Sequence, residues 1–261
     1  MGPHRNIAET SQLRDAASVV LIRDGAADVE AFTLTRAPSM AAFPNATVFP
    51  GGGVDPADAL PAEAWEGADL SLWARTFDDD EASVRRLLVA AVRETFEECG
   101  VLLAERLDST RPSPHDYASA RSALENGELD MREFLSSHGL RVDFSLLRPL
   151  SRWITPEGSP RRYDTRFFLA RLPAGQQAWR TTGEATLSQW MSPSTAFSLF
   201  REGRTHLMPP TWSQFRTLSS FRSTQEALSA EFGPRRITPT LVGSSAPQRV
   251  NFPDANEYYA Q

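Results

Sequence analysis

Cysteine is almost absent from this 261-residue chain, which contains only Cys99. A single thiol excludes an intramolecular disulfide, so we expect a reducing compartment and a cytoplasmic location. Histidine is scarce too. The four histidines show no metal-ligand spacing, and we interpret them as incidental: His4, His115, His138 and His206.

Long hydrophobic runs and an excess of basic residues are also missing. No apolar run approaches the roughly 20 residues of a membrane span, and segment 1–18 lacks the apolar core of a secretory signal. The net charge is −6, with 33 acidic residues. We therefore expect neither a membrane nor a nucleic acid as partner. An acidic protein that handles an anionic substrate needs a cation between the two.

The pattern of apolar residues predicts one mixed α/β domain. Alternating or β-branched runs predict strands at 16–24, 29–37, 46–53, 151–158 and 165–173. Helical spacing predicts a long helix at 78–100 and shorter ones within 114–138, 187–203 and 209–232. We expect a domain over 16–232 with insertions at 59–78 and 105–145, a flexible segment at 1–15 and an extended C-terminal tail at 233–261.

The two insertions carry apolar side chains that we interpret as exposed. These are Trp65 and Trp73 in the first insertion and Leu135 and Leu140 in the second. Exposed apolar side chains mark contact surfaces. The insertions therefore predict either a substrate lid or a contact in a homodimer.

The segment 78–100 has the marks of a stable helix. Acidic residues crowd its first turn, and Gly100 stands where a C-terminal glycine cap belongs. Leu88, Val92, Phe96 and Cys99 form one apolar stripe at helical spacing. Cys99 is therefore interpreted as a packing residue rather than as a nucleophile.

Three carboxylates share another face of this helix, because Glu94, Glu97 and Glu98 stand at positions i, i+3 and i+4. One interpretation is a solvated acidic face in which Arg93 pairs with Glu97. The other is a site for a hard divalent cation, which takes oxygen ligands and is completed by substrate phosphates. The C-terminal end of a helix disfavours negative charge, and this favours the metal site.

The glycines of "FPGGGVDPADAL" (49–60) connect to this helix through a known motif. Gly52 is followed after five residues by Asp58, and later by Arg93-Glu94-Thr95-Phe96-Glu97-Glu98-Cys99-Gly100-Val101. This pattern resembles the box of the Nudix hydrolases, which split a diphosphate linked to a nucleoside with a divalent metal. The resemblance implies a Nudix-type α/β/α sandwich with a mixed sheet and helical insertions, and Mg²⁺ or Mn²⁺ as cofactor.

The box is interrupted. Seven residues usually separate its first acid from the Arg-Glu pair, whereas residues 59–92 intervene here. Together with "VFPGG" (48–52), "WITP" (153–156) and "RYDTRFFLA" (162–170), this resembles a subgroup typified by the peroxisomal coenzyme A diphosphatases.

The subgroup implies cleavage of coenzyme A or acyl-CoA to 3′,5′-ADP and (acyl-)4′-phosphopantetheine. A hydrolase of ADP-ribose, NADH or dinucleoside polyphosphates remains an alternative, as does a housecleaning enzyme with broad substrate tolerance. A third alternative is a non-catalytic module that binds a small nucleotide.

The resemblance also implies roles for the carboxylates. Glu97 and Glu98 are expected as the main metal ligands. Glu94 is expected as a further ligand or as the group that accepts a proton from the attacking water. Arg93 is expected to orient Glu97. Glu184, six residues before a tryptophan, is expected as one more ligand, and its alternative is an ordinary surface acid.

The glycines have a simple physical explanation. Without a Cβ, Gly51 and Gly52 let the backbone approach the metal site and the substrate closely. Gly53, Asp55 and Asp58 are expected to position this loop against the helix.

Three arginines are candidate phosphate contacts, because guanidinium groups match phosphate oxygens. They are Arg36, Arg161 and Arg162, and surface ion pairing is the alternative for each. Three aromatic residues are interpreted as core rather than as base-stacking groups: Trp153, Phe167 and Phe168.

Overall fold

The computed structural model describes residues 12–40, 43–66, 68–179, 183–233, 235–243 and 249–260. Its centre is a mixed eight-stranded sheet in the order β10-β7-β8-β1-β2-β3, with β4 paired to β1 and β9 paired to β2. The β1–β8 and β10–β7 pairs are parallel, and the others are antiparallel. The strands are β1 (Leu13–Asp24), β2 (Val29–Arg36), β3 (Thr47–Val48), β4 (Gly51–Gly53), β7 (Leu147–Ile154), β8 (Arg162–Arg171), β9 (Ala185–Met191) and β10 (Arg236–Ile237).

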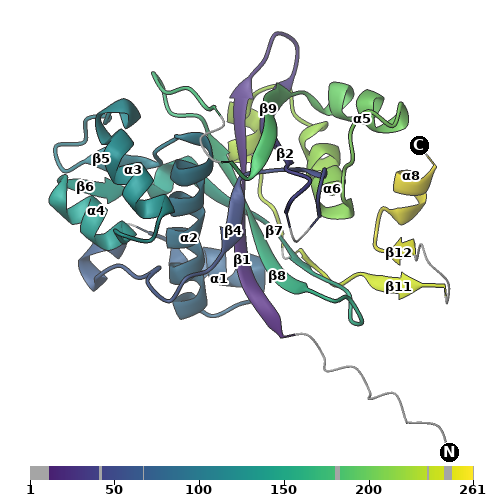
Figure 1. Cartoon of the computed structure of the whole chain (residues 1–261), viewed down its shortest axis with the longest axis horizontal. Helices are drawn as coiled ribbons and strands as arrows, with labels where there is room; N and C mark the ends of the chain where they lie inside the picture. The colour runs from purple at the N-terminus through teal and green to yellow at the C-terminus, as the bar shows by residue number, and fades with distance from the viewer. Residues whose placement is uncertain are drawn as a thin grey trace, which may run out of the picture.

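Helices cover both faces of this sheet (Figure 1). One face carries α1 (Leu70–Phe77), α2 (Glu81–Cys99), α3 (Ala118–Glu125) and α4 (Met131–Ser137). The other carries α5 (Pro193–Arg201), α6 (Pro209–Leu218), α7 (Thr224–Ser229) and α8 (Ala255–Tyr259). The predicted α/β sandwich with a mixed sheet is confirmed. Across the described ranges, no helix combines the length and apolar character that a membrane crossing needs.

Short elements complete the chain. The 3₁₀ helices are η1 (Ala62–Trp65), η2 (Pro114–Tyr117) and η3 (Phe144–Leu146). Two small antiparallel pairs stand apart from the main sheet: β5 (Ala104–Arg106) with β6 (Leu140–Val142), and β11 (Thr240–Val242) with β12 (Arg249–Asn251).

The central strand β1 is apolar on both sides. Val19 and Leu21 belong to the core under α2, while Val20 and Ile22 belong to the core under α6. Successive side chains of a strand point to opposite faces, so a continuous apolar run is what a sheet covered on both faces requires.

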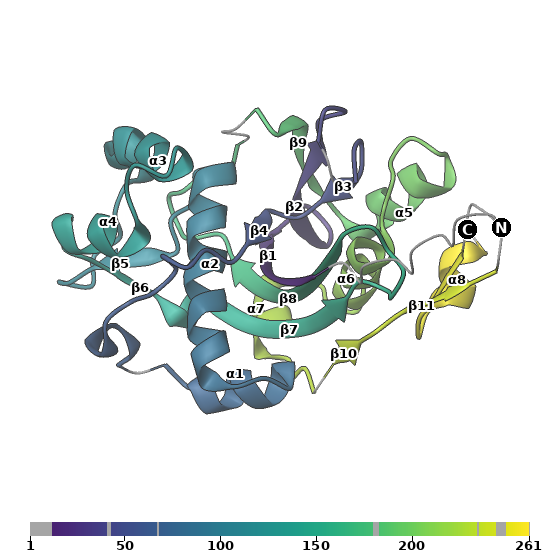
Figure 2. The same ribbon diagram turned by 60° about the horizontal axis from the view of Figure 1, so that its bottom comes forward.

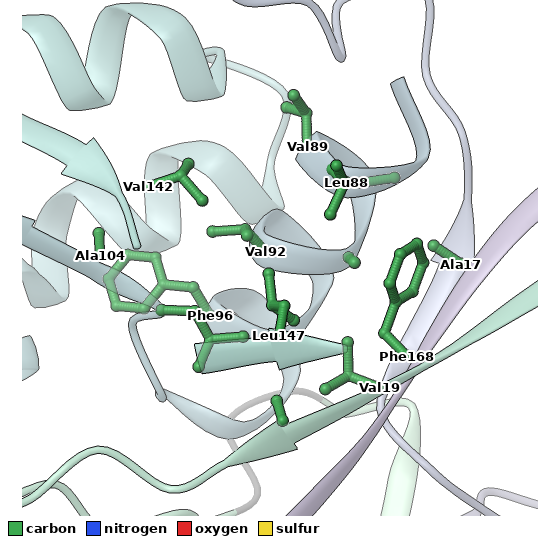
Figure 3. Close-up of a cluster of buried hydrophobic side chains, with 14 of the residues drawn as sticks. Ala17, Val19, Leu88, Val89, Val92, Phe96, Ala104, Val142, Leu147 and Phe168 are labelled. Atoms are coloured by element: carbon green, nitrogen blue, oxygen red, sulfur yellow. The ribbon is translucent and has the colours of Figure 1, made fainter. Parts of the chain in front are cut away.

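Helix α2 begins and ends where the sequence predicts. The Asp80 side chain accepts a hydrogen bond from the Ser83 backbone N–H, and Gly100 closes the helix at φ 67°. Val92 and Phe96 lie in the same buried cluster as Phe168 of β8 (Figure 3). This packing fixes α2 against the sheet (Figure 2).

The expectation of exposed apolar side chains in the two insertions is wrong. Trp65 and Trp73 are only 8% and 5% exposed, and Leu135 and Leu140 are each 5% exposed. The Trp73 ring lies 5.7 Å from the ring of Phe168, so the first insertion packs into the core beside α2. These side chains therefore form neither a lid nor a dimer surface.

A buried charge network explains part of the motif at 162–170. Asp164 forms a bidentate pair with Arg152, and Arg166 contacts Asp164, Asp79 and Asp15. Asp79 directly precedes the N-cap of α2, so the network connects the start of this helix to β1, β7 and β8. Removing one partner from such a network leaves a buried charge uncompensated.

The ends of the chain differ from the expectation. Residues 1–11 of the expected flexible segment lie outside the described residues, and β1 already begins at Leu13. The C-terminal segment is not simply extended: it forms β10, β11, β12 and α8 (Figures 1 and 2). Phe252 and Tyr258 are buried in the core under α6. The few apolar residues of the C-terminal segment are too widely spaced in the sequence to show a helix or strand period, although they pack into the core.

Candidate active site

A cleft of about 590 Å³ brings most of the predicted site residues together. From the prediction, its lining includes Arg36, Gly51, Gly52, Gly53, Glu94, Glu97, Glu98 and Glu184. Five predicted residues do not line it: Arg93, Asp55, Asp58, Arg161 and Arg162. The cleft therefore joins the end of α2, strand β4 and the start of β9.

Strand β4 is locked between β1 and α2. Gly51 pairs with Ser18 of β1, and its N–H donates to Glu98 Oε2 at 2.8 Å. A Cβ at Gly51 would lie 2.6 Å from Ser18 Cα, and one at Gly52 would lie 2.7 Å from Glu94 Cδ. Real Cβ contacts are not this close, so Gly51 requires glycine against the backbone of β1, whereas a Cβ at Gly52 would displace the Glu94 carboxylate.

Arg93 has a different principal partner from the one expected. Its Nε and Nη2 form a bidentate pair with Asp58 at 2.8 and 2.9 Å, and Nη2 also donates to Gly53 O. Its Nη1 lies 2.8 Å from Glu94 Oε1 but 3.4 Å from Glu97 Oε2. Arg93 thus connects the glycine loop to α2 and holds Glu94 more closely than Glu97.

The loop between β4 and the first insertion is held by its own carboxylates. The Asp55 N–H donates to Asp58 Oδ2 at 2.7 Å, and the Ala57 N–H donates to Asp55 Oδ1 at 2.8 Å. Side-chain oxygens that accept local backbone N–H groups are typical of such turns. Asp58, which is 1% exposed, therefore holds both the turn and Arg93.

Burial makes the three helix glutamates reluctant to ionise together. Burial raises the pKa of Glu97 to about 7, although the charge of Arg93 opposes the shift. Burial, and then the charge of Glu94, raise the pKa of Glu98 well above its usual range. The pKa of Glu94 is raised too, again chiefly by burial. Each shift reports an electrostatic cost that added positive charge would relieve.

The pKa of Arg93 is raised as well, but for a cation a raised pKa favours the charged form. Burial alone would lower the pKa of its guanidinium, but the hydrogen bond to Asp58 and the charges of Glu94, Asp58 and Glu97 raise it. Arg93 therefore stays charged and compensates part of the negative charge behind the cleft.

Glu184 and Arg36 reach the same place from two neighbouring strands. Strands β2 and β9 pair through Arg36 and Ala185, and the Ala37 N–H donates to Glu184 O at 2.7 Å. The charge of Glu184 raises the pKa values of Glu94 and Glu98, and the charge of Arg36 lowers that of Glu98. The edge formed by these strands thus adds one acidic and one basic side chain to the glutamates of α2.

These residues fit a hard divalent cation. The donors are carboxylate oxygens, which Mg²⁺ and Mn²⁺ prefer, and the missing Cβ of Gly52 leaves the Glu94 carboxylate directly against backbone. Within the described ranges, no three acidic, histidine or cysteine side chains already form a complete metal cage. Arg93 contacts two of the candidate ligands, and metal binding would compete with these contacts.

Two of the three candidate phosphate-binding arginines are placed elsewhere. Arg161 is exposed, and Arg162 donates to Thr155 O at 3.2 Å. Both belong to the start of β8 and its preceding turn, and neither lines the cleft. Of the three candidates, Arg36 is thus the one that lines the cleft together with the carboxylates.

The cleft wall contains residues to which the sequence assigned no part in the site. Trp153 and Phe167 are buried as expected, but they also form part of the cleft wall. Phe168, in contrast, packs under α2. Glu125 and Phe43 line the cleft as well. Glu125 comes from α3, a helix of the second insertion, and no spacing in the sequence relates it to the box.

Comparisons with known proteins agree with this geometry. The human acyl-coenzyme A diphosphatase NUDT19 is 29% identical over 228 residues, covering 73% of this chain and 60% of the human protein. The corresponding chicken protein is 29% identical over 260 residues, covering 80% of this chain and 69% of its own length. The chain therefore spans about three fifths of the human relative.

A solved structure shows the same fold. The crystal structure of a Nudix hydrolase from Alicyclobacillus acidocaldarius superposes with a TM-score of 0.71 at 29% identity. The match covers 86% of this chain and 99% of the other. The family model described as the NUDT19 Nudix domain matches residues 79–218, which include α2 and its glutamates. Because that match spans more than half of the sequence, the chain belongs to the Nudix family, in the group defined by the NUDT19 Nudix domain.

Proposed function

We propose that this protein is a metal-dependent diphosphatase that hydrolyses coenzyme A or acyl-CoA to 3′,5′-ADP and (acyl-)4′-phosphopantetheine. The observation that carries the reaction class is the meeting of Glu94, Glu97, Glu98 and Glu184 with the glycine strand in one cleft. The substrate class rests on similarity to relatives named acyl-coenzyme A diphosphatases.

Glu97 and Glu98 would hold the cation, with Glu184 as a further ligand from the edge of the sheet. When bound, a divalent cation neutralises charge on the diphosphate and makes an attacking water more acidic. Glu94 then accepts the proton of that water at a carboxylate oxygen. Arg93 and Asp58 keep Glu94 in place, and the N–H of Gly51 fixes one oxygen of Glu98.

Because the cleft is negatively charged, substrate binding also requires the cation. Five glutamates line the cleft and repel a diphosphate, and among the described lining residues Arg36 is the one basic side chain. Arg36 would contact a phosphate oxygen, for which a guanidinium is well suited. The arrangement therefore predicts little affinity for the diphosphate without a divalent cation.

The test is turnover of a substrate panel by the purified protein with Mg²⁺. The panel contains CoA, acetyl-CoA, ADP-ribose, NADH and diadenosine polyphosphates, and product masses identify the bond that is cut. We expect CoA esters to give 3′,5′-ADP and Glu98→Gln to abolish turnover. Glu81→Gln is the matched control, because Glu81 lies on the same helix but is exposed at its other end.

Each outcome has a distinct meaning. Cleavage of another diphosphate retains the reaction class and rejects the substrate. Nucleotide binding without any cleavage rejects the enzyme in favour of a binding module. Equal turnover by Glu98→Gln and the wild type rejects the assignment of the site.

A further inference from the structure

The cleft continues from the carboxylates to a second wall made by the C-terminal segment. Pro239, Leu241 and Val250 line it there. The same cleft is lined by residues of β7 and the start of α6, among them Trp153, Met208, Pro209 and Pro210. The charged lining side chains of the described residues come from β2, α2, α3 and the turn before β9, so this second end is uncharged.

Leu241 and Val250 form one apolar pair on the inner face of a hairpin. They are direct cross-strand partners between β11 and β12, and both are half-buried. Their neighbours Thr240, Val242 and Arg249 are exposed, as the alternation of side chains along a strand requires. Only the face with Leu241 and Val250 belongs to the cleft.

The hairpin is held firmly enough to act as a wall. Strand β10, just before it, pairs with β7 through Ile237 and Trp153. Phe252, just after it, contacts the Trp153 ring edge-to-face at 5.7 Å. Tyr258 of α8 donates a hydrogen bond to Leu207 O at 2.9 Å.

We propose that Leu241 and Val250 are specificity-determining residues that bind the alkyl chain of an acyl group, which in acyl-CoA is joined to the diphosphate through the pantetheine arm. This rests on the proposed function in that the diphosphate occupies the carboxylate end of the same cleft. An uncharged, apolar wall continuous with a diphosphate site suits a chain of methylene groups. A phosphate group would lack a basic partner on the hairpin, because Arg36 of β2 is the one basic side chain among the described lining residues.

The consequence is a preference that depends on chain length. Each methylene that becomes fully buried strengthens binding by about threefold to fourfold, and a cleft that stays partly open gives less. Catalytic efficiency should therefore rise from CoA through acetyl-CoA and hexanoyl-CoA to decanoyl-CoA. Polar residues on the inner face of the hairpin should reduce this dependence of catalytic efficiency on chain length without changing the catalytic efficiency with free CoA.

The experiment compares kcat/KM for these four substrates in three proteins. They are the wild type, the double variant Leu241→Gln/Val250→Thr, and the control Val242→Thr, whose side chain is 52% exposed on the outer face. We expect the decanoyl-CoA to CoA ratio to be at least about tenfold in the wild type. The double variant should lower that ratio at least about fivefold, with the CoA value within about twofold of wild type. The control should match the wild type.

A binding measurement separates this inference from the proposed function. Calorimetry in a Glu98→Gln background measures the affinity for CoA and for decanoyl-CoA without turnover. Tighter binding of decanoyl-CoA that the double variant loses supports the alkyl site even if no diphosphate is ever cleaved. A wild-type protein that shows no dependence on chain length in either assay overturns the inference, whether or not the variants fold.

Discussion

Replacing Asp58 with asparagine removes the main partner of Arg93 while retaining the size of the side chain. Asp58 is 1% exposed and accepts two hydrogen bonds from the guanidinium and one from the Asp55 N–H. Breaking a buried ion pair costs about 3–5 kcal/mol. Arg93 keeps Glu94 and Glu97 as partners, so we expect a smaller loss of about 2–3 kcal/mol in the free energy of unfolding.

That loss can be measured by chemical and thermal denaturation. For a domain of this size it corresponds to a decrease in melting temperature of about 5–10 °C. Asp58→Asn also frees Arg93 to move toward Glu94 and Glu97, where it competes with the cation. The Mg²⁺ concentration that gives half-maximal activity should therefore rise.

The control is Asp55→Asn, because Asp55 is exposed and its Oδ1 accepts a hydrogen bond from the Ala57 N–H. An asparagine oxygen can accept the same bond, so the change in stability should stay within about 0.5 kcal/mol. If Asp58→Asn and Asp55→Asn melt together and require the same Mg²⁺, Arg93 is not the link between the loop and the helix.

Three further changes test other parts of the structure. Gly52→Ala forces the Glu94 carboxylate to move, so kcat should fall about 100-fold with little change in the circular dichroism melt; wild-type turnover would contradict the close approach. Gly100→Ala places a Cβ 3.0 Å from the Trp179 ring at φ 67°, and urea denaturation should show a loss of about 1–3 kcal/mol. Burial, and then the charge of Tyr259, raise the pKa of Tyr258 to about 12. The stabilising effect of neutral Tyr258 is present below its unfolded pKa of about 10 and lost toward pH 12. Tyr258→Phe should remove one late-titrating phenol at 295 nm.

Helix α2 and the three glutamates that it carries could be predicted from the sequence because their signals are local. Gly100 and the apolar stripe fix the end and the buried face of α2, and both depend on neighbours within a few turns. The spacing of Glu94, Glu97 and Glu98 fixes their common face in the same way. Family resemblance added Glu184, which spacing alone could not have related to α2.

The rest of the site depends on contacts between distant segments. Trp73 reads as exposed in a sequence rich in proline and glycine, yet it packs on Phe168, 95 positions later. Leu241 and Val250 are two isolated apolar residues in a segment with no period, and they reach the cleft because β10 pairs with β7 just before their hairpin. Arg162 looked suited to phosphate, but Thr155 O already accepts from its Nε. No local pattern carries such information.

The interruption of the box shows how the fold tolerates a long insertion just before helix α2. Lengthening the connection from seven residues to the 34 of segment 59–92 costs about 1.4 kcal/mol of loop-closure entropy. The insertion offsets this by burying Trp73 and Phe77 against Phe168, each contributing about 1.5–3 kcal/mol. The Asp58–Arg93 pair then joins the two ends of this insertion across 35 positions. The insertion is therefore part of the core, and its removal would expose Phe168 instead of restoring a simpler enzyme.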